Sequence, residues 1–150
     1  MTSEEQAAYD RFKEMLPIDL LRLDDDLQEM PQIVQEVGEH TTRAAIARDE
    51  ADLNRNQVKS VVMSQLRSSG EKKPPETQIA SDVLLDLTYQ KAESEYQKKS
   101  NDFAMWRTLS GSWNAKMSCI SEAVRLLGMG YCTVQNITNK RREEYRKDRA

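Results

Sequence analysis

Side chains able to perform acid–base or metal chemistry are few in this sequence and are not grouped. His40 is the only histidine, and no cysteine lies near it in the sequence to serve as a second metal ligand or a nucleophile. Asp24, Asp25 and Asp26 are adjacent, so on a helix with 3.6 residues per turn their carboxylates point in different directions. This arrangement favours capping or solvation of a helix over binding of a metal ion.

The other reactive groups also lack the spacing that catalysis requires. Glu93 and Glu95 occupy neighbouring polar positions typical of the solvated face of a helix, and the chain has no glycine-rich phosphate loop, HExxH motif, Ser-His-Asp set or Cys-His set. Cys119 and Cys132, the only cysteines, lie in or beside apolar helical sequence, which favours reduced, buried thiols in a cytoplasmic protein. One histidine cannot complete a zinc site. We therefore expect a protein that is not an enzyme and holds no metal or cofactor.

Composition favours long helices in a single domain of residues 1–150. The chain has only five glycines and four prolines, and it is rich in Ala, Glu, Gln, Lys, Arg and Leu, which favour helix. No apolar run approaches 18 residues, so no membrane-spanning segment is predicted. The acidic, polar start from Met1 to Glu5 is unlike a signal peptide. We expect an all-α protein of the cytoplasm.

Residues 83–127 are predicted to form one long helix that buries a narrow stripe. No proline interrupts this stretch, and its one glycine is Gly111. Large side chains recur every seven residues in two rows offset by four, which are the a and d positions of a coiled coil. Such a helix rises about 68 Å, whereas a compact domain of this size has a radius of gyration of about 15 Å. We expect an elongated molecule whose stripe is completed by other helices, some from other subunits. The rows are Leu85, Ala92, Lys99, Trp106, Trp113, Ile120 and Leu127, and Tyr89, Tyr96, Phe103, Ser110, Met117 and Val124.

The contacts between subunits are assigned to the large side chains in the second half of this helix. These oligomerisation residues are Phe103, Trp106, Trp113, Met117, Ile120, Val124 and Leu127.

The N-terminal segment, residues 1–30, is acidic. It holds nine Asp and Glu against three Lys and Arg. Thr2 and Glu5 fit a capping box, and Pro17 ends the first helical pattern. Its charge and its leucines suit the docking of a basic partner protein or of the basic tail of a neighbouring subunit.

A second helix is predicted over residues 31–68, because Pro31 is well suited to a first helical turn. Residues 69–82 contain Gly70 and the paired prolines Pro74 and Pro75, which predict a loop, and a short helical stretch from Thr77 is expected to lead into the long helix. Ser100-Asn101-Asp102 is the weakest point of the long helix, because an N-cap there would divide it.

Gly128 and Gly130 mark the end of the long helix, and residues 131–150 form a basic C-terminal helix. The predicted fold is an elongated antiparallel helical hairpin with short N- and C-terminal helices, assembling into a homo-oligomer.

Two groups of basic residues are candidates for phosphate contacts. Arg55 and Lys59 lie four residues apart and share a helix face, and further basic residues follow at the end of the hairpin. A solvated helix face explains the first group equally well, whereas the group in the tail is denser. The candidate DNA-binding residues are Arg55, Lys59, Arg67, Lys72 and Lys73, with Lys140, Arg141 and Arg142 in the tail.

The C-terminal half contains an aromatic-rich helix, a turn of glycine, aromatic and small apolar residues, and a final amphipathic helix. Upstream lie a Leu/Asp/Glu-rich segment, an Arg-Asp-Glu-Ala stretch and a Gly-Glu-Lys loop. Over roughly Asp19 to Ile137 this pattern resembles the UvsY-type phage recombination mediators. The residues that carry the resemblance are Met105, Trp106, Ser110, Trp113, Ile120, Leu127, Gly130-Tyr131-Cys132-Thr133-Val134-Gln135-Asn136-Ile137, Arg48-Asp49-Glu50-Ala51, Gly70-Glu71-Lys72 and Thr77.

The resemblance implies a ring-like homo-oligomer in the cytoplasm of a phage-infected bacterium. Such a protein binds single-stranded DNA, weakens the hold of a single-strand-binding protein and helps to load a RecA-like recombinase. The family's basic pair followed by an aromatic pair is reduced here to Lys59 in Val58-Lys59-Ser60-Val61-Val62-Met63. The alternative is a structural or adaptor protein, such as a phage assembly factor, that binds no nucleic acid.

Overall fold

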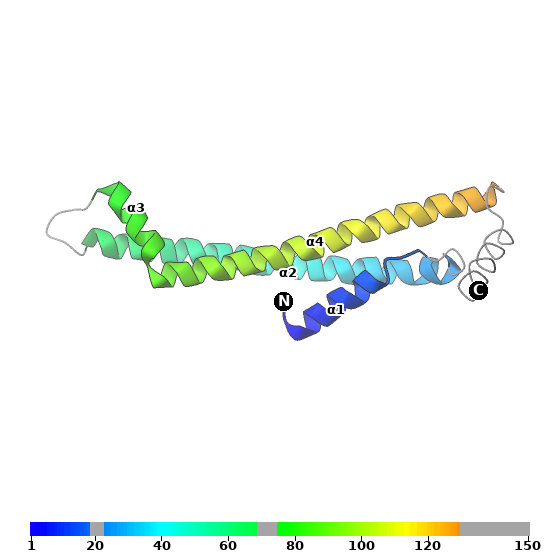
Figure 1. The fold of residues 1–150 in the computed structure, drawn as a ribbon, viewed down its shortest axis with the longest axis horizontal. Helices are drawn as coiled ribbons and strands as arrows, with labels where there is room; N and C mark the ends of the chain where they lie inside the picture. Colours follow the sequence, from blue (N-terminus) through cyan, green and yellow to red (C-terminus); the bar gives the residue numbers. More distant parts are fainter. Residues whose placement is uncertain (19–22, 69–74, 130–150) are drawn as a thin grey trace, which may run out of the picture. The chain divides into compact units, whose positions relative to one another are not determined.

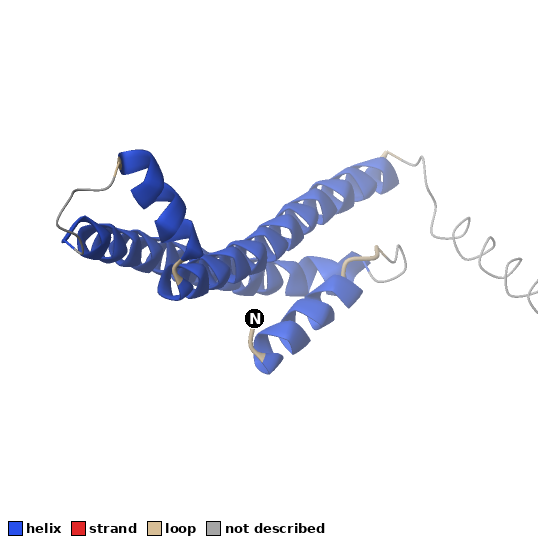
Figure 2. Ribbon diagram, turned by 60° about the vertical axis from the view of Figure 1, so that its left-hand side comes forward, coloured by secondary structure: helices blue, strands red, loops and turns tan. Residues whose placement is uncertain are grey.

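The computed structural model describes residues 1–18, 23–68 and 75–129. Within these ranges the chain forms four helices and no strand: α1 (Ser3–Glu14), α2 (Leu23–Ser68), α3 (Glu76–Leu85) and α4 (Leu87–Gly128) (Figure 1). Figure 2 shows the same helices without any sheet between them. The predicted all-α class is confirmed. The expected C-terminal helix, residues 131–150, lies outside the described residues.

The helices pack as two compact units. Unit 1 comprises Met1 and Glu39–Arg107, and unit 2 comprises Thr2–Gly38 and Thr108–Ala150. Helices α2 and α4 each contribute to both units.

In unit 1, α2 and α4 pair in opposite directions, with α3 at their connected end. Ring contacts link the two helices in reverse order: His40 with Trp106 (ring centroids 4.4 Å apart), Arg48 with Phe103 (4.3 Å) and Arg55 with Tyr96 (4.2 Å). Near α3, Val62 of α2, Ile79 and Val83 of α3 and Tyr89 of α4 form a buried cluster. Helix α3 forms around this cluster, because Ile79 and Val83 lie one turn apart and bury the same face. The short helical stretch expected from Thr77 corresponds to α3, so the second half of the predicted loop, residues 69–82, is helix.

In unit 2, α1 begins with the predicted capping box. The hydroxyl of Thr2 accepts a hydrogen bond from the backbone N–H of Glu5 (3.2 Å), and the carboxylate of Glu5 accepts one from the backbone N–H of Thr2 (2.7 Å). Phe12 is the buried residue of α1. Met30, Ile33 and Val37 of α2, and Leu109, Trp113 and Ile120 of α4, are also buried.

The predicted rows of α4 are buried in part. Ala92, Trp106, Trp113 and Ile120 of the first row are buried, whereas Leu85 is exposed. In the second row the prediction fails beyond Phe103, because Met117 and Val124 are exposed and Leu109 and Lys116 are buried instead. The buried face rotates by one position because α4 meets the end of α1 in unit 2, where Lys116 contacts a backbone carbonyl of Met15.

The start of α2 differs from the prediction. The helix begins at Leu23 and not at Pro31, which lies inside the helix. A proline inside a helix costs about 3 kcal/mol, and the burial of Leu23 and Met30 on the preceding turns offsets that cost.

The long helix is interrupted at Asp86, not near Ser100. Asp86 has an extended backbone (ψ 127°) and its carboxylate accepts hydrogen bonds from the backbone N–H groups of Thr88 (2.8 Å) and Tyr89 (3.0 Å). Asp86 is therefore the N-cap of α4, and Ser100-Asn101-Asp102 remains helical.

Candidate nucleic-acid interface

Arg55, a predicted phosphate ligand, is held inside unit 1. Its guanidinium lies 2.6 Å from a carboxylate oxygen of Asp52 and 3.5 Å from one of Glu93, and it stacks over the ring of Tyr96. The Asp52 contact is an ion pair without hydrogen-bond geometry, since that oxygen has no hydrogen-bond partner in the described part of the chain. With its side chain 24% exposed, Arg55 joins α2 to α4, and its guanidinium already has carboxylate partners.

Glu93 is the centre of this polar layer. It accepts hydrogen bonds from the amide of Gln97 (3.0 Å) and the hydroxyl of Tyr89 (3.1 Å). The Gln97 hydrogen bond, followed by those of Tyr89 and Arg55, holds the pKa of Glu93 below its ordinary value. Burial, and then the hydrogen bond to Glu93, raises the pKa of Tyr89. The layer therefore favours a charged Glu93 and a neutral Tyr89, and a polar layer of this kind fixes the register of paired helices.

The other predicted cations fall into two groups. One guanidinium nitrogen of Arg67, Nη2, donates to both carboxylate oxygens of Glu76 in α3, at 3.0 Å each. Both side chains are exposed. Lys59 is exposed and makes no ion pair with another described residue. Five predicted cations lie outside the described residues: Lys72, Lys73, Lys140, Arg141 and Arg142.

Two lysines that the sequence reasoning overlooked face solvent on α4. Lys91 and Lys98 lie seven residues apart, so they share one face of the helix. Both are exposed, and neither makes an ion pair or hydrogen bond within the described ranges. The signal was present in the heptad pattern, because both lysines fall outside the two predicted rows. It was overlooked because they are separated by six residues and do not form a run.

The large aromatic side chains are not available for stacking on bases. Trp106 and Trp113 are each 1% exposed. Trp106 is covered by His40, whose ring is nearly parallel to it, with an interplanar angle of 6°. The sequence-based preference for a core position of both tryptophans agrees with this burial, and His40 acts here as a packing residue.

The residues assigned to subunit contacts differ in how exposed their side chains are. Trp106, Trp113 and Ile120 are buried inside the chain, so they are not free to contact another subunit. Phe103 and Leu127 are partly buried. Met117 and Val124 are 45% and 42% exposed. On α2, Ile46 and Leu53 lie one heptad apart and are 54% and 60% exposed, which makes them the more accessible apolar pair.

Lys116 forms the polar junction of unit 2. Its ammonium group donates to the backbone carbonyl of Met15 (2.8 Å) and to the carboxylate of Asp26 (3.1 Å), and it lies 5.0 Å from the ring centroid of Trp113. A buried lysine with these partners ties the end of α1 and the start of α2 to α4. Lys116 falls outside the two predicted rows, and its partners Met15 and Asp26 lie 101 and 90 residues away along the chain.

Reactive groups do not form a site elsewhere in the described residues. No group of three His, Cys, Asp or Glu residues there is arranged to hold a metal ion. Cys119 is exposed, contrary to the expected buried thiol, because it neighbours the core residue Ile120 and points about 100° away from it.

None of the helices in the described ranges combines the length and apolar character needed to cross a membrane.

Comparisons of the chain with protein-family models, with curated proteins and with solved structures give no match.

Proposed function

We propose that this protein is a single-stranded DNA-binding recombination mediator that acts as a homo-oligomer without catalysis. In this role it helps a RecA-like recombinase to replace single-strand-binding protein on DNA. The sequence pattern from Asp19 to Ile137 supports this function through its resemblance to the UvsY-type mediators.

The observation that carries the proposal is the pair of exposed lysines on α4. Lys91 and Lys98 are about 10.5 Å apart along the helix axis at 1.5 Å per residue. Both are exposed and neither forms an ion pair within the described residues, since the nearby carboxylates of Glu95 and Asp102 pair with Lys99 and with the amino group of Met1. Lys59 of α2 is exposed in the same unit. These lysines replace Arg55 and Arg67 as the proposed phosphate contacts, and the tail from Lys140 to Arg142 remains a predicted second contact.

A homo-oligomer compensates for the small number of exposed, unpaired cations on one subunit. The chain carries a net charge of −3, which disfavours binding of a polyanion by a single copy. Repetition of Lys91 and Lys98 around an assembly multiplies the number of phosphates neutralised, and affinity grows with that number. We assign the subunit contacts to the exposed pair Ile46 and Leu53, because Trp106 and Trp113 are buried within the chain.

The test is the salt dependence of binding to a fluorescently labelled oligothymidylate, measured by anisotropy. Replacement of Lys91 and Lys98 together by alanine should weaken binding. The slope of log affinity against log salt should become shallower by about 0.7 for each phosphate that is no longer neutralised. The matched control changes the same two positions to arginine, which retains both charges and should retain the parental slope. Light scattering of each variant verifies an unchanged mass.

Two outcomes contradict the proposal at different levels. If the unchanged protein binds no single-stranded DNA at low salt, the mediator function is wrong. If the alanine variant binds with the parental slope, the phosphate-binding residues lie elsewhere, and removal of residues 140–150 then tests the tail.

A structural or adaptor role is the second candidate, and one observation favours it. Ile46 and Leu53 expose apolar surface on α2, and paired apolar residues at heptad spacing suit the binding of a helix of another protein. An assembly that forms normally but ignores DNA at every salt concentration would support this role over the mediator function.

A further inference from the structure

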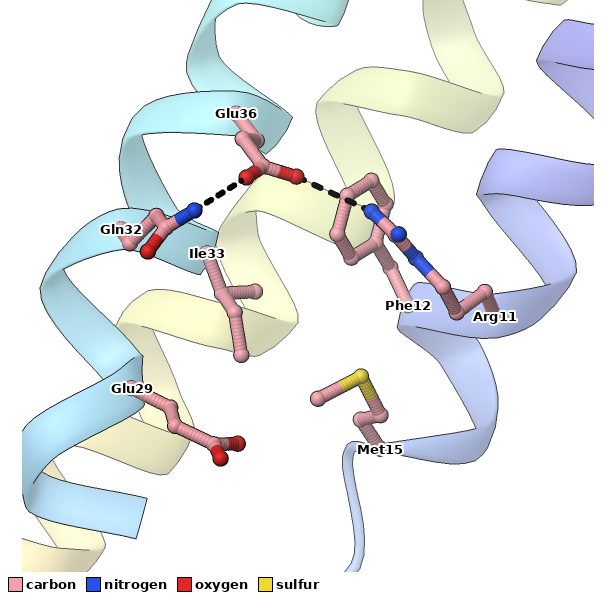
Figure 3. Close-up of a pocket in the computed structure, with 7 residues that line it drawn as sticks. All are labelled: Arg11, Phe12, Met15, Glu29, Gln32, Ile33 and Glu36. Carbon is pink, nitrogen blue, oxygen red and sulfur yellow. Dashed lines mark hydrogen bonds and ion pairs between the residues drawn. The ribbon is translucent and has the colours of Figure 1, made fainter. Parts of the chain in front are cut away.

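A cleft of about 310 Å³ lies between α1 and α2 in unit 2 (Figure 3). Its floor is apolar and consists of Phe12 and Met15 from α1 and Ile33 from α2. Its rim is charged and consists of Arg11, Glu29 and Glu36.

One end of the cleft is closed by a chain of polar contacts. The guanidinium of Arg11 donates to one oxygen of the Glu36 carboxylate (2.9 Å), and the amide of Gln32 donates to the other (3.0 Å). Arg11 also lies 4.4 Å from the ring centroid of Phe12, which shields that ring. Figure 3 shows this bridge from α2 to α1 above the cleft.

A carboxylate without a partner among the described residues also lines the cleft. Glu29 points from α2 toward the side of the cleft where Met15 lies (Figure 3). It makes no ion pair or hydrogen bond with any other residue described in the structure. A carboxylate beside an apolar floor suits a lysine or arginine side chain, whose methylene stem packs on apolar atoms while its charged end reaches the carboxylate.

We propose that this cleft is the docking site of the chain's own basic C-terminal segment, residues 140–150. That segment carries six Lys and Arg against three Asp and Glu, together with Tyr145 as an apolar anchor. Residues 1–36 carry ten Asp and Glu against three Lys and Arg. Opposite charge steers the segment to this part of unit 2. Phe12 and Ile33 are already buried (1% and 9% exposed), so the partly buried Met15 is the apolar side chain of the floor that is left for contact.

The length of the chain allows the segment to reach the cleft. Lys116 of α4 contacts the carbonyl of Met15, a residue that lines the cleft. From Lys116, α4 continues to Gly128, a rise of about 18 Å at 1.5 Å per residue. Residues 130–139 span up to about 33 Å when extended. This tether is longer than the return path along α4, so docking within one chain needs no distortion of the helices.

The first test is zero-length carbodiimide cross-linking of the full chain, followed by mass spectrometry. Lys140 or Lys147 should be joined to Glu29 or Glu36 in a species with the mass of a single chain. The proposal is overturned if neither tail lysine is joined to these carboxylates, or if such links occur only in cross-linked dimers.

The second test measures trypsin cleavage after Lys140, Arg141 and Arg142 in the full chain, because docking should slow it. Glu29→Gln should increase the initial rate several-fold. The matched control is Glu14→Gln, which removes the same charge from an exposed position of α1 that does not line the cleft. Equal cleavage rates in the two variants and the parent would overturn the docking model, whether or not the protein binds DNA.

Discussion

Replacement of Lys116 by methionine is expected to destabilise unit 2 strongly. The lysine side chain is 4% exposed and donates to the carbonyl of Met15 and to the carboxylate of Asp26. Methionine retains most of the buried stem, so the change isolates the loss of the ammonium group. Breaking a buried ion pair by removal of one partner costs about 3–5 kcal/mol. Asp26 is 24% exposed, so water partly compensates its charge, and we expect about 3 kcal/mol.

The assay is urea unfolding followed by circular dichroism and by tryptophan fluorescence. With a denaturant slope of about 1–3 kcal/mol per molar urea, a loss of about 3 kcal/mol lowers the midpoint by about 1–3 M. Lys98→Met is the matched control, because Lys98 lies on the same helix and is exposed. Surface changes of this kind alter stability by no more than about 0.5 kcal/mol.

A double-mutant cycle with Asp26→Asn measures the ion pair itself. Asparagine leaves a neutral oxygen for Lys116, so the single change should cost less than Lys116→Met. The two changes together should cost less than their sum, with a coupling energy of about 0.5–3 kcal/mol. Equal midpoints for Lys116→Met and Lys98→Met would refute the assignment of Lys116 as the junction of α1, α2 and α4.

Two further changes test the helices. Gly38→Ala and Gly111→Ala should each raise the free energy of unfolding by about 0.5–1 kcal/mol in urea titrations, because a Cβ at either position meets no atom within 4 Å and the unfolded chain loses entropy; a destabilised variant would show that a glycine is required there. Because its folded pKa is lowered, Glu93 contributes stability above its unfolded pKa, near 4.5, and loses it as pH falls through the folded value. The melting temperature should therefore fall in acid, and Glu93→Gln should make that fall shallower; an identical pH profile would contradict this.

The helices themselves were largely predictable from sequence. Helical class, the capping box at Thr2 and Glu5, and the end of α4 at Gly128 all depend on residues close together in the chain. The break at Asp86 was also local, since Asp86 precedes Leu87-Thr88-Tyr89 as an N-cap does. It was missed because the heptad rows run through it, and a periodic pattern gives no information on whether one turn is interrupted.

The rotation of the buried face of α4 was not predictable in this way. Trp106, Trp113 and Ile120 satisfy both the predicted rows and the observed core. Whether Met117 or Lys116 is their buried neighbour depends on the end of α1. There the backbone carbonyl of Met15, the C-cap of α1, accepts a hydrogen bond from the ammonium group of Lys116. Local periodicity treats a lysine as a surface residue, and only a distant acceptor reverses that assignment.

The candidate interface shows the same dependence on distant partners. Arg55 and Lys59 share a helix face in the sequence and belong to one apparent cluster. In unit 1 the guanidinium of Arg55 contacts two carboxylates and an aromatic ring, whereas Lys59 has no such partner among the described residues. A cation with its carboxylates already in place must break those interactions before it can bind a phosphate, and it contributes little to the salt dependence of binding. Exposed lysines without partners, such as Lys91 and Lys98, carry no such cost. The proposed phosphate contacts therefore include unpaired cations on the outside of the helices, which a search for the densest basic runs of the sequence does not find.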